Sequence, residues 1–109
     1  MNFEVIAVPI FKKEIKRLVK KYPSLKQEFL SLAENLAVDP YQGTSLGNNC
    51  YKIRIAISSK GKGKSGGARI ITHIIITVKT VFLLSIYDKS EKQNLTDAEL
   101  KELLKDIPK

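Results

Sequence analysis

The sequence predicts an α+β fold in which helices pack on an antiparallel sheet. Three observations lead there: two helical patterns near the N-terminus, alternating strand patterns between residues 51 and 87, and a capped helical pattern near the C-terminus. At 109 residues and 43% hydrophobic content, the chain is the size of a single domain, which we place at residues 1–109.

The N-terminal third predicts one strand and a helical hairpin. Residues Phe3–Val8 alternate weakly and are rich in β-branched and aromatic side chains, which suits a short strand. Pro9 fits the first turn of a helix over Ile10–Tyr22, whose apolar stripe leaves a basic outer face. A second amphipathic helix follows the break at Pro23-Ser24 and ends at Asp39-Pro40. Because the break is short, we expect the two helices to form a hairpin.

Three further strands follow an irregular connection at Tyr41–Asn49. Residues Tyr51–Ser58 alternate cleanly between apolar and polar side chains, and Ala68–Val78 forms the next strand. A tight hairpin at Lys79-Thr80 leads to the last strand, Val81–Tyr87. We expect the N-terminal strand to pair within the same sheet.

A capping box starts the last helix. Thr96 and Glu99 have the spacing of that motif, and an apolar stripe of Leu100, Leu103, Leu104 and Ile107 follows. The predicted order is therefore β-α-α-β-β-β-α, with an N-terminal helical hairpin and a C-terminal helix on the sheet.

Composition narrows the class of function. A formal charge of +8 and a pI near 9.6 make nucleic acid or an anionic membrane surface plausible partners. The apolar runs are too short to span a bilayer, and the N-terminus does not read as a signal peptide. The single Cys50 cannot form an internal disulfide, which favours a reduced compartment. We therefore expect a soluble cytoplasmic protein without a membrane partner.

The most informative stretch runs from Lys52 to Ile71, where six lysines and arginines occur without any acid. By strand parity Lys52, Arg54 and Arg69 share the exposed sheet face opposite the hairpin, and they converge if their strands pair through the intervening loop. Solvated surface residues would give the same pattern. A cluster of fixed cations is also suited to stabilise the extra charge of a pentacoordinate phosphate transition state.

The loop between these strands, Lys60–Gly67, supplies further positive charge. Its Gly63-Lys64-Ser65 matches the tail of a P-loop, but Ser58 stands where that motif needs glycine, and a strand follows where it needs a helix. The loop is either a mobile solvated connection or a basic segment that docks on RNA phosphates.

Other chemistries have less support. The acids are scattered without metal-ligand spacing, so no metal site is expected. His73, the only histidine, is the only base that could serve a serine or cysteine nucleophile, and a lone histidine on a strand is more often structural.

Two stretches resemble a known family. CYKIRIAISSKGKGKSGGARII and VFLLSIYDKSEKQNLTDAELKEL, together with the order of elements, resemble the RelE/ParE superfamily of toxin-antitoxin toxins, in particular its HigB-type branch. The resemblance covers nearly the whole chain. It implies a small toxin, held inactive by a cognate antitoxin, that enters the 70S ribosome and cleaves translated mRNA.

The resemblance also implies a mechanism and its residues. Such enzymes use no metal or cofactor, and they activate the ribose 2′-hydroxyl to attack the adjacent phosphate. By position, the catalytic residues are Lys52, Arg54, Arg69 and Lys89, where Arg69 matches the arginine at the scissile phosphate. We expect the substrate contacts to come from Lys60, Lys62, Lys64, His73 and Tyr87.

One departure concerns proton transfer. Where the best-known RelE-like members carry a tyrosine in the C-terminal segment, this chain has Leu95. Tyr87, Glu91 and His73 are the remaining candidates.

Two alternatives remain open. A ParE-like toxin would poison DNA gyrase through protein contact without a catalytic cluster. A non-catalytic basic RNA-binding module would need aromatic stacking platforms, and only Tyr51, Tyr87 and a few phenylalanines are available.

Overall fold

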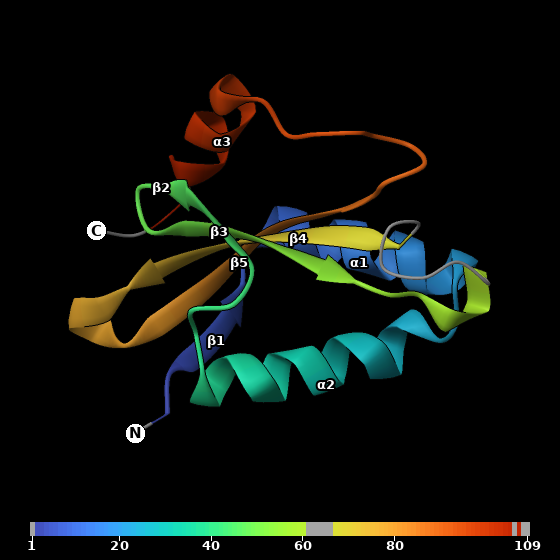
Figure 1. Cartoon of the computed structure of the whole chain (residues 1–109), viewed down its shortest axis with the longest axis horizontal. Coiled ribbons are helices and arrows are strands. Elements are labelled where there is room, and N and C mark those ends of the chain that lie inside the picture. Colours follow the sequence, from blue (N-terminus) through green and yellow to red (C-terminus); the bar gives the residue numbers. More distant parts are fainter. Residues whose placement is uncertain (1, 61–66, 106, 108–109) are drawn as a thin grey trace.

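A computed structural model describes residues 2–60, 67–105 and 107. In this part of the chain, three α-helices and five strands are arranged around one twisted sheet (Figure 1). The helices are α1 (Pro9–Lys21), α2 (Leu25–Val38) and α3 (Asp97–Leu104). The strands are β1 (Glu4–Ala7), β2 (Thr44–Gly47), β3 (Cys50–Ile55), β4 (Ala68–Ile75) and β5 (Thr80–Asp88). The α+β class and the helical hairpin followed by strands are confirmed.

The sheet has the order β1-β5-β4-β3-β2, so β4 is its central strand. The strands β2 to β5 pair antiparallel, as expected, but β1 lies parallel to β5. The expectation that the N-terminal strand pairs within the same sheet is confirmed, but its direction differs from that of the predicted antiparallel sheet. The alternation of side chains fixes which face of a strand is buried, but it does not fix the direction in which the strand runs.

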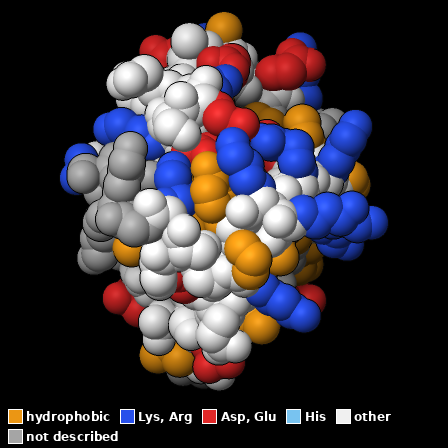
Figure 2. Space-filling view, turned by 90° about the vertical axis from the view of Figure 1, so that its right-hand side faces the viewer, with side chains coloured by type: hydrophobic (Ala, Val, Ile, Leu, Met, Phe, Trp, Pro, Cys, Tyr) orange, Lys and Arg blue, Asp and Glu red, His pale blue; other side chains and the backbone are white. Residues whose placement is uncertain are grey.

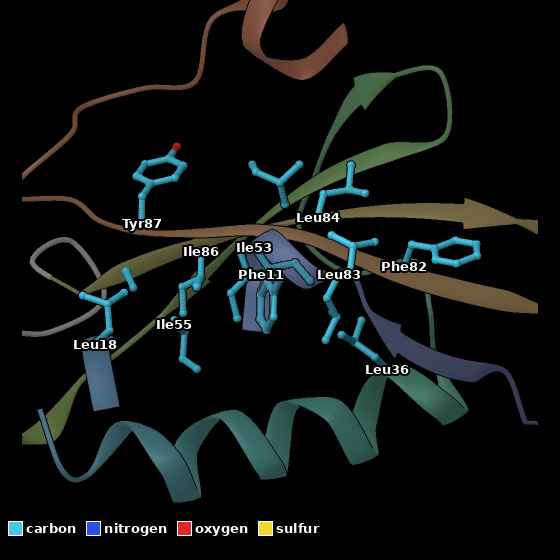
Figure 3. Close-up of a cluster of buried hydrophobic side chains, with 14 of the residues drawn as sticks. Phe11, Leu18, Leu36, Ile53, Ile55, Phe82, Leu83, Leu84, Ile86 and Tyr87 are labelled. Atoms are coloured by element: carbon cyan, nitrogen blue, oxygen red, sulfur yellow. The ribbon is translucent and has the colours of Figure 1, made fainter. Parts of the chain in front are cut away.

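The hydrophobic core lies between the hairpin and one face of the sheet. Ile53, Ile70 and Ile86 are opposite one another on β3, β4 and β5, and all three are buried. The helices supply fully buried Phe11, Leu18, Leu25 and Leu36. In Figure 3 the side chains of Ile55 and Ile86 point toward the helices, whereas Tyr87 points to the other side of the sheet. The predicted parity of the strands is thereby confirmed.

The strand β2 lies inside the connection that the sequence analysis treated as irregular. Its four residues are exposed, so no buried apolar side chain marks it in the sequence. The turn to β3 is formed by Asn48 and Asn49, with φ of 53° and 58°. A two-residue hairpin turn with both φ positive has the twist of paired strands, and asparagine tolerates it. The prediction for this segment was wrong because the turn residues were read as a loop.

The strand β4 is shorter than predicted. It ends at Ile75, and a single 3₁₀ turn over Ile76–Val78 precedes Lys79, whose φ of 47° lies in the left-handed region. The connection to β5 is therefore longer than the expected tight hairpin at Lys79-Thr80.

The helix α3 lies on the opposite side of the sheet from α2 (Figure 1). The Thr96 hydroxyl accepts from the Glu99 N–H, and the Glu99 carboxylate accepts from the Thr96 N–H, so the predicted capping box is present. Leu100 is buried beneath the helix. Among the described residues, none of the helices combines the length and the hydrophobicity needed to cross a bilayer.

Candidate active site

A row of three side chains crosses the sheet on the face away from the hairpin. Arg54 on β3 is the cross-strand partner of Arg69 on β4, and Arg69 is the partner of Tyr87 on β5. Side chains directly opposite one another in antiparallel strands have Cβ atoms about 5 Å apart. The expected convergence of Arg54 and Arg69 is therefore confirmed, and Tyr87 joins them. We call these three residues the basic row.

Arg69 is buried, with 2% of its surface exposed, which corrects the expectation of an exposed sheet-face residue. The physical reason is its place on the central strand, where Arg54 and Tyr87 flank it from both sides. One guanidinium nitrogen donates to the backbone carbonyl of Ala68 at 3.1 Å. Burial lowers the pKa of Arg69, and the like charge of Arg54 lowers it further. This concentrated positive charge favours an anionic ligand.

Tyr87 is buried beside Arg69, with 6% of its surface exposed. Among the described residues, no group lies within hydrogen-bonding distance and angle of its hydroxyl. Burial raises the pKa of the Tyr87 phenol, while the charges of Arg69 and Lys92 and the nearby backbone of Leu95 act in the opposite direction. A buried hydroxyl of this kind is free to bond a substrate group once that group reaches it.

Lys52 and Arg54 flank a recess of about 280 Å³ where β2 meets β3. Lys52 pairs with Thr44 on one side and with Ile71 on the other. Gly43, at φ +88°, lies so close that an added Cβ would stand 2.2 Å from the Lys52 carbonyl oxygen. Sequence reasoning missed Gly43, although a glycine just before a strand is the available signal.

Lys60 is engaged in a buried ion pair. Its Nζ lies 2.6 Å from Asp88 Oδ1, with 7% and 0% of the two side chains exposed, and 5.1 Å from the centre of the Tyr22 ring. In this structure Lys60 therefore holds β5 rather than facing solvent, and its substrate contact stays a prediction. Lys62 and Lys64 lie outside the described residues.

Asp88, which the sequence analysis did not single out, anchors the end of β5. Besides Lys60, its carboxylate accepts from the Tyr22 hydroxyl at 2.8 Å and from the N–H and the hydroxyl of Ser90 at 2.9 and 2.8 Å. Burial alone would raise the pKa of Asp88, but these donors outweigh burial and hold the pKa well below its usual range. The only feature of the sequence that could have indicated this role of Asp88 is its position as an acid within a basic segment.

Lys89 follows Asp88 directly. Its N–H donates to the Gly67 carbonyl at 3.2 Å, which keeps Lys89 next to the start of β4. Lys89 and Arg69 thus lie near the same end of the sheet, and the catalytic role of Lys89 stays a prediction.

Two of the three candidates for proton transfer are occupied elsewhere. Glu91 forms ion pairs with Arg17 at 2.9 Å and Lys21 at 3.6 Å, and the Arg17 hydrogen bond lowers the pKa of Glu91. The Nδ1 of His73 lies 3.3 Å from the sulfur of Cys50, where burial raises the thiol pKa to about 11. His73 is four residues along β4 from Arg69, or about 13 Å at the usual rise of a strand. Of the three candidates for proton transfer, the geometry therefore favours Tyr87, which lies in the basic row next to Arg69.

The described residues contain no cluster of three histidines, cysteines or acids placed to hold a metal ion. What the site offers is fixed positive charge and one phenol. Such groups can bind a phosphodiester, stabilise added charge on its oxygens and exchange a proton.

Comparison with known proteins identifies the family and similar folds. A family model described as the RelE toxin of the RelE/RelB toxin-antitoxin system matches residues 8–108. The fold is similar to that of a mutant E. coli toxin RelE in the free state, with a TM-score of 0.63 and 16% identity, covering 99% of this chain and 100% of that one.

Two further solved structures are similar. The toxin-antitoxin complex RelBE2 from Mycobacterium tuberculosis gives a TM-score of 0.59 and 14% identity, with 81% of this chain and 99% of that chain covered. The isolated E. coli RelE toxin gives 0.51 and 16%, with 96% and 99% covered. At sequence identities this low, the structural similarity shows a shared fold and nothing further.

Proposed function

Because the chain belongs to the RelE toxin family, we propose that it is a ribosome-dependent mRNA endonuclease whose catalytic surface is the basic row. The observation that carries this proposal is the alignment of Arg54, Arg69 and Tyr87 across three strands. The cytoplasm, where translation takes place, is the proposed site of action, and a cognate antitoxin is the proposed inhibitor.

The proposed reaction needs three things from the protein. The ribose 2′-hydroxyl must lose its proton, the phosphorus must accept a fifth oxygen, and the leaving 5′-oxygen must be protonated. Arg69 and Arg54 would stabilise the added negative charge on the phosphate oxygens, with Lys52 and Lys89 at the edges of the site. Tyr87 is the titratable group placed to exchange a proton beside Arg69.

The ribosome has a specific part in this proposal. Tyr87 is covered in the free protein, and its neighbours include Lys92 and Glu99, which are joined by an ion pair. For the substrate to reach Tyr87, the segment after β5 must therefore move away from it. Binding to the large RNA surface of the ribosome would supply the free energy for this movement. The toxin would then cut only on the ribosome.

The test is cleavage mapping. An mRNA is translated in a reconstituted system with the purified protein, and cuts are located by primer extension, with a parallel reaction that lacks ribosomes. Cuts that require ribosomes and end in a 2′,3′-cyclic phosphate support the proposal. A folded, growth-arresting protein that leaves translated mRNA intact would contradict it.

The ParE-like alternative predicts a different outcome in cells. Gyrase poisoning would induce the DNA-damage response while mRNA stays intact. No described feature of the site favours that reading over RNA cleavage, and binding without any cleavage would identify the third class, a plain RNA-binding module.

A further inference from the structure

The segment that covers Tyr87 buries little apolar surface. We call residues 89–95, between β5 and α3, the covering segment. It contains no helix or strand, and Leu95 is its only apolar residue. The side chain of Lys92 and the backbone of Leu95 neighbour the Tyr87 phenol. Because so few apolar contacts hold it, the covering segment should open at a small cost in free energy.

Ion pairs with α1 hold the covering segment in place. The Glu91 carboxylate accepts from two nitrogens of Arg17, at 2.9 and 3.3 Å, and lies 3.6 Å from the Nζ of Lys21. Arg17 and Lys21 are one helical turn apart, so both cations reach the same carboxylate. The side chains of Arg17 and Lys21 are 56% and 51% exposed, and that of Glu91 is 38% exposed. Other anions can therefore compete for the two cations.

Cations outnumber Glu91 on this side of the molecule. Six exposed lysines and arginines occupy the outer face of α1: Lys12, Lys13, Lys16, Arg17, Lys20 and Lys21. Within the described chain, Glu91 is the only acid that forms ion pairs with any of them. Glu14, the one acid of α1, instead accepts from the Ser85 hydroxyl at 3.0 Å. Figure 2 shows lysines and arginines gathered on the side of the molecule that faces right in Figure 1, with acidic side chains beside them.

An RNA backbone can replace Glu91 as the partner of these cations. Arginine forms the same two-pronged contact with a phosphate as with a carboxylate. An RNA strand also presents several phosphates in series to the other lysines of α1 and releases their counterions, whereas Glu91 presents one carboxylate. RNA that binds along α1 would therefore take Arg17 and Lys21 away from Glu91.

We propose that the pairing of Glu91 with Arg17 and Lys21 is an autoinhibitory contact, which RNA phosphates break by binding these two cations. In the free protein this contact keeps the covering segment over Tyr87. Once it is broken, the segment opens and the substrate reaches the basic row. The proposal rests on the endonuclease function put forward above, and it gives Glu91 a regulatory role in place of proton transfer.

Amide hydrogen exchange measures the opening of the covering segment. The N–H groups of Glu91 and Lys92 both donate to the Asp88 carbonyl at 3.0 Å, so their protection factors report the closed state. We expect Glu91→Gln to lower the protection factor of Lys92 about fivefold, the upper end for an exposed ion pair, because two cations share this carboxylate. Glu102→Gln is the matched control, since it breaks an exposed ion pair with Lys105 outside the segment and should leave that factor unchanged.

A second arm of the experiment adds RNA that cannot be cleaved. A short single-stranded RNA with a 2′-O-methyl group on every ribose lacks the nucleophile, so exchange is read without cleavage. Saturating RNA should lower the protection factor of Lys92 in wild type to the value of Glu91→Gln. The same RNA should cause no further loss in Glu91→Gln, because the ion pairs are already broken. Without RNA, Arg17→Gln/Lys21→Gln should match Glu91→Gln.

Two results would overturn the proposal. One is a Lys92 protection factor in Glu91→Gln within about twofold of wild type, which would show that an ion pair of ordinary surface strength does not hold the segment closed. The other is RNA that fails to bind wild type, or that binds, as fluorescence anisotropy would show, without loss of protection. Failure of the endonuclease proposal would appear separately, as translated mRNA left intact by wild type, because hydrogen exchange does not depend on cleavage.

Discussion

At the scale of single residues, two neighbours on β5 have opposite roles. Tyr87 is part of the basic row, and its hydroxyl has no hydrogen-bond partner among the described residues, whereas Asp88 faces the hairpin and accepts from four donors. Strand alternation produces this division, because consecutive side chains point to opposite faces. Substitutions at these two adjacent positions should therefore separate the cleavage rate, through Tyr87, from the stability of the fold, through Asp88.

Tyr87→Phe tests the chemical role. We expect the variant to fold with nearly wild-type stability, because no hydrogen bond is lost, and to cleave about 10² to 10⁴ times more slowly if Tyr87 transfers a proton. Single-turnover cleavage on programmed ribosomes measures the rate. Tyr22→Phe is the matched control: it removes the hydrogen bond to Asp88 and should lower stability while sparing the chemical step. Equal cleavage rates for Tyr87→Phe and wild type would remove Tyr87 from the mechanism.

Asp88→Asn tests the anchor. Removing one partner of a buried ion pair leaves Lys60 uncompensated, so we expect a loss of about 3 to 5 kcal/mol in the free energy of unfolding at pH 7. Urea unfolding measures it. A loss below about 1 kcal/mol, the level of an exposed pair, would show that the pair does not anchor β5.

The same residue gives a pH dependence. The pKa of Asp88 is lowered in the folded state, so its stabilisation is fully present above the unfolded-state pKa of about 4. That contribution is lost as pH falls from there toward the folded-state pKa. We therefore expect wild type to lose more stability than Asp88→Asn between pH 5 and pH 3, and parallel pH profiles would contradict the assignment.

At the scale of elements, β2 shows where sequence patterns fail. The stripes of α1, α2 and α3 were visible because each buries one face, and β3 was visible because its isoleucines alternate. β2 buries nothing, so only its turn chemistry could have marked it. Its position is fixed instead by the close approach of Gly43 to β3.

Gly43→Ala tests this approach, with Gly47→Ala as its control. Both glycines have a positive φ, +88° and +84°, but only Gly43 has backbone within reach of an added Cβ. Gly47→Ala should cost about 1 kcal/mol for the strained backbone alone. Gly43→Ala should cost clearly more, because β2 must move away from Lys52. Equal losses in thermal unfolding would show that the close contact does not hold β2.

At the scale of the whole molecule, the fold separates surfaces by face. The hairpin covers one face of the sheet, and the opposite face, the side on which α3 lies, carries the basic row. Parity predicted the face of Lys52, Arg54 and Arg69 from sequence. It could not predict that Arg69 is buried, because burial depends on the neighbours that a central strand acquires in the sheet.

The partners in the long-range ion pairs also could not be predicted from the sequence. Lys60 and Asp88 are 28 positions apart, and Arg17 and Glu91 are 74 apart. Charge composition gives no indication of such pairings. These pairings determine which of the nineteen lysines and arginines stabilise the fold and which are available to bind a ligand.

The most direct test of the central claim is the single-turnover cleavage rate of Arg69→Met on programmed ribosomes, beside Arg69→Lys and wild type. Methionine keeps much of the buried volume without the charge, and lysine keeps the charge without the planar fork. If Arg69 stabilises the transition state, Arg69→Met should cleave about 10² to 10³ times more slowly while thermal unfolding shows a folded protein, with Arg69→Lys in between. A folded Arg69→Met protein that cleaves at the wild-type rate would contradict the assignment of the basic row as the catalytic surface.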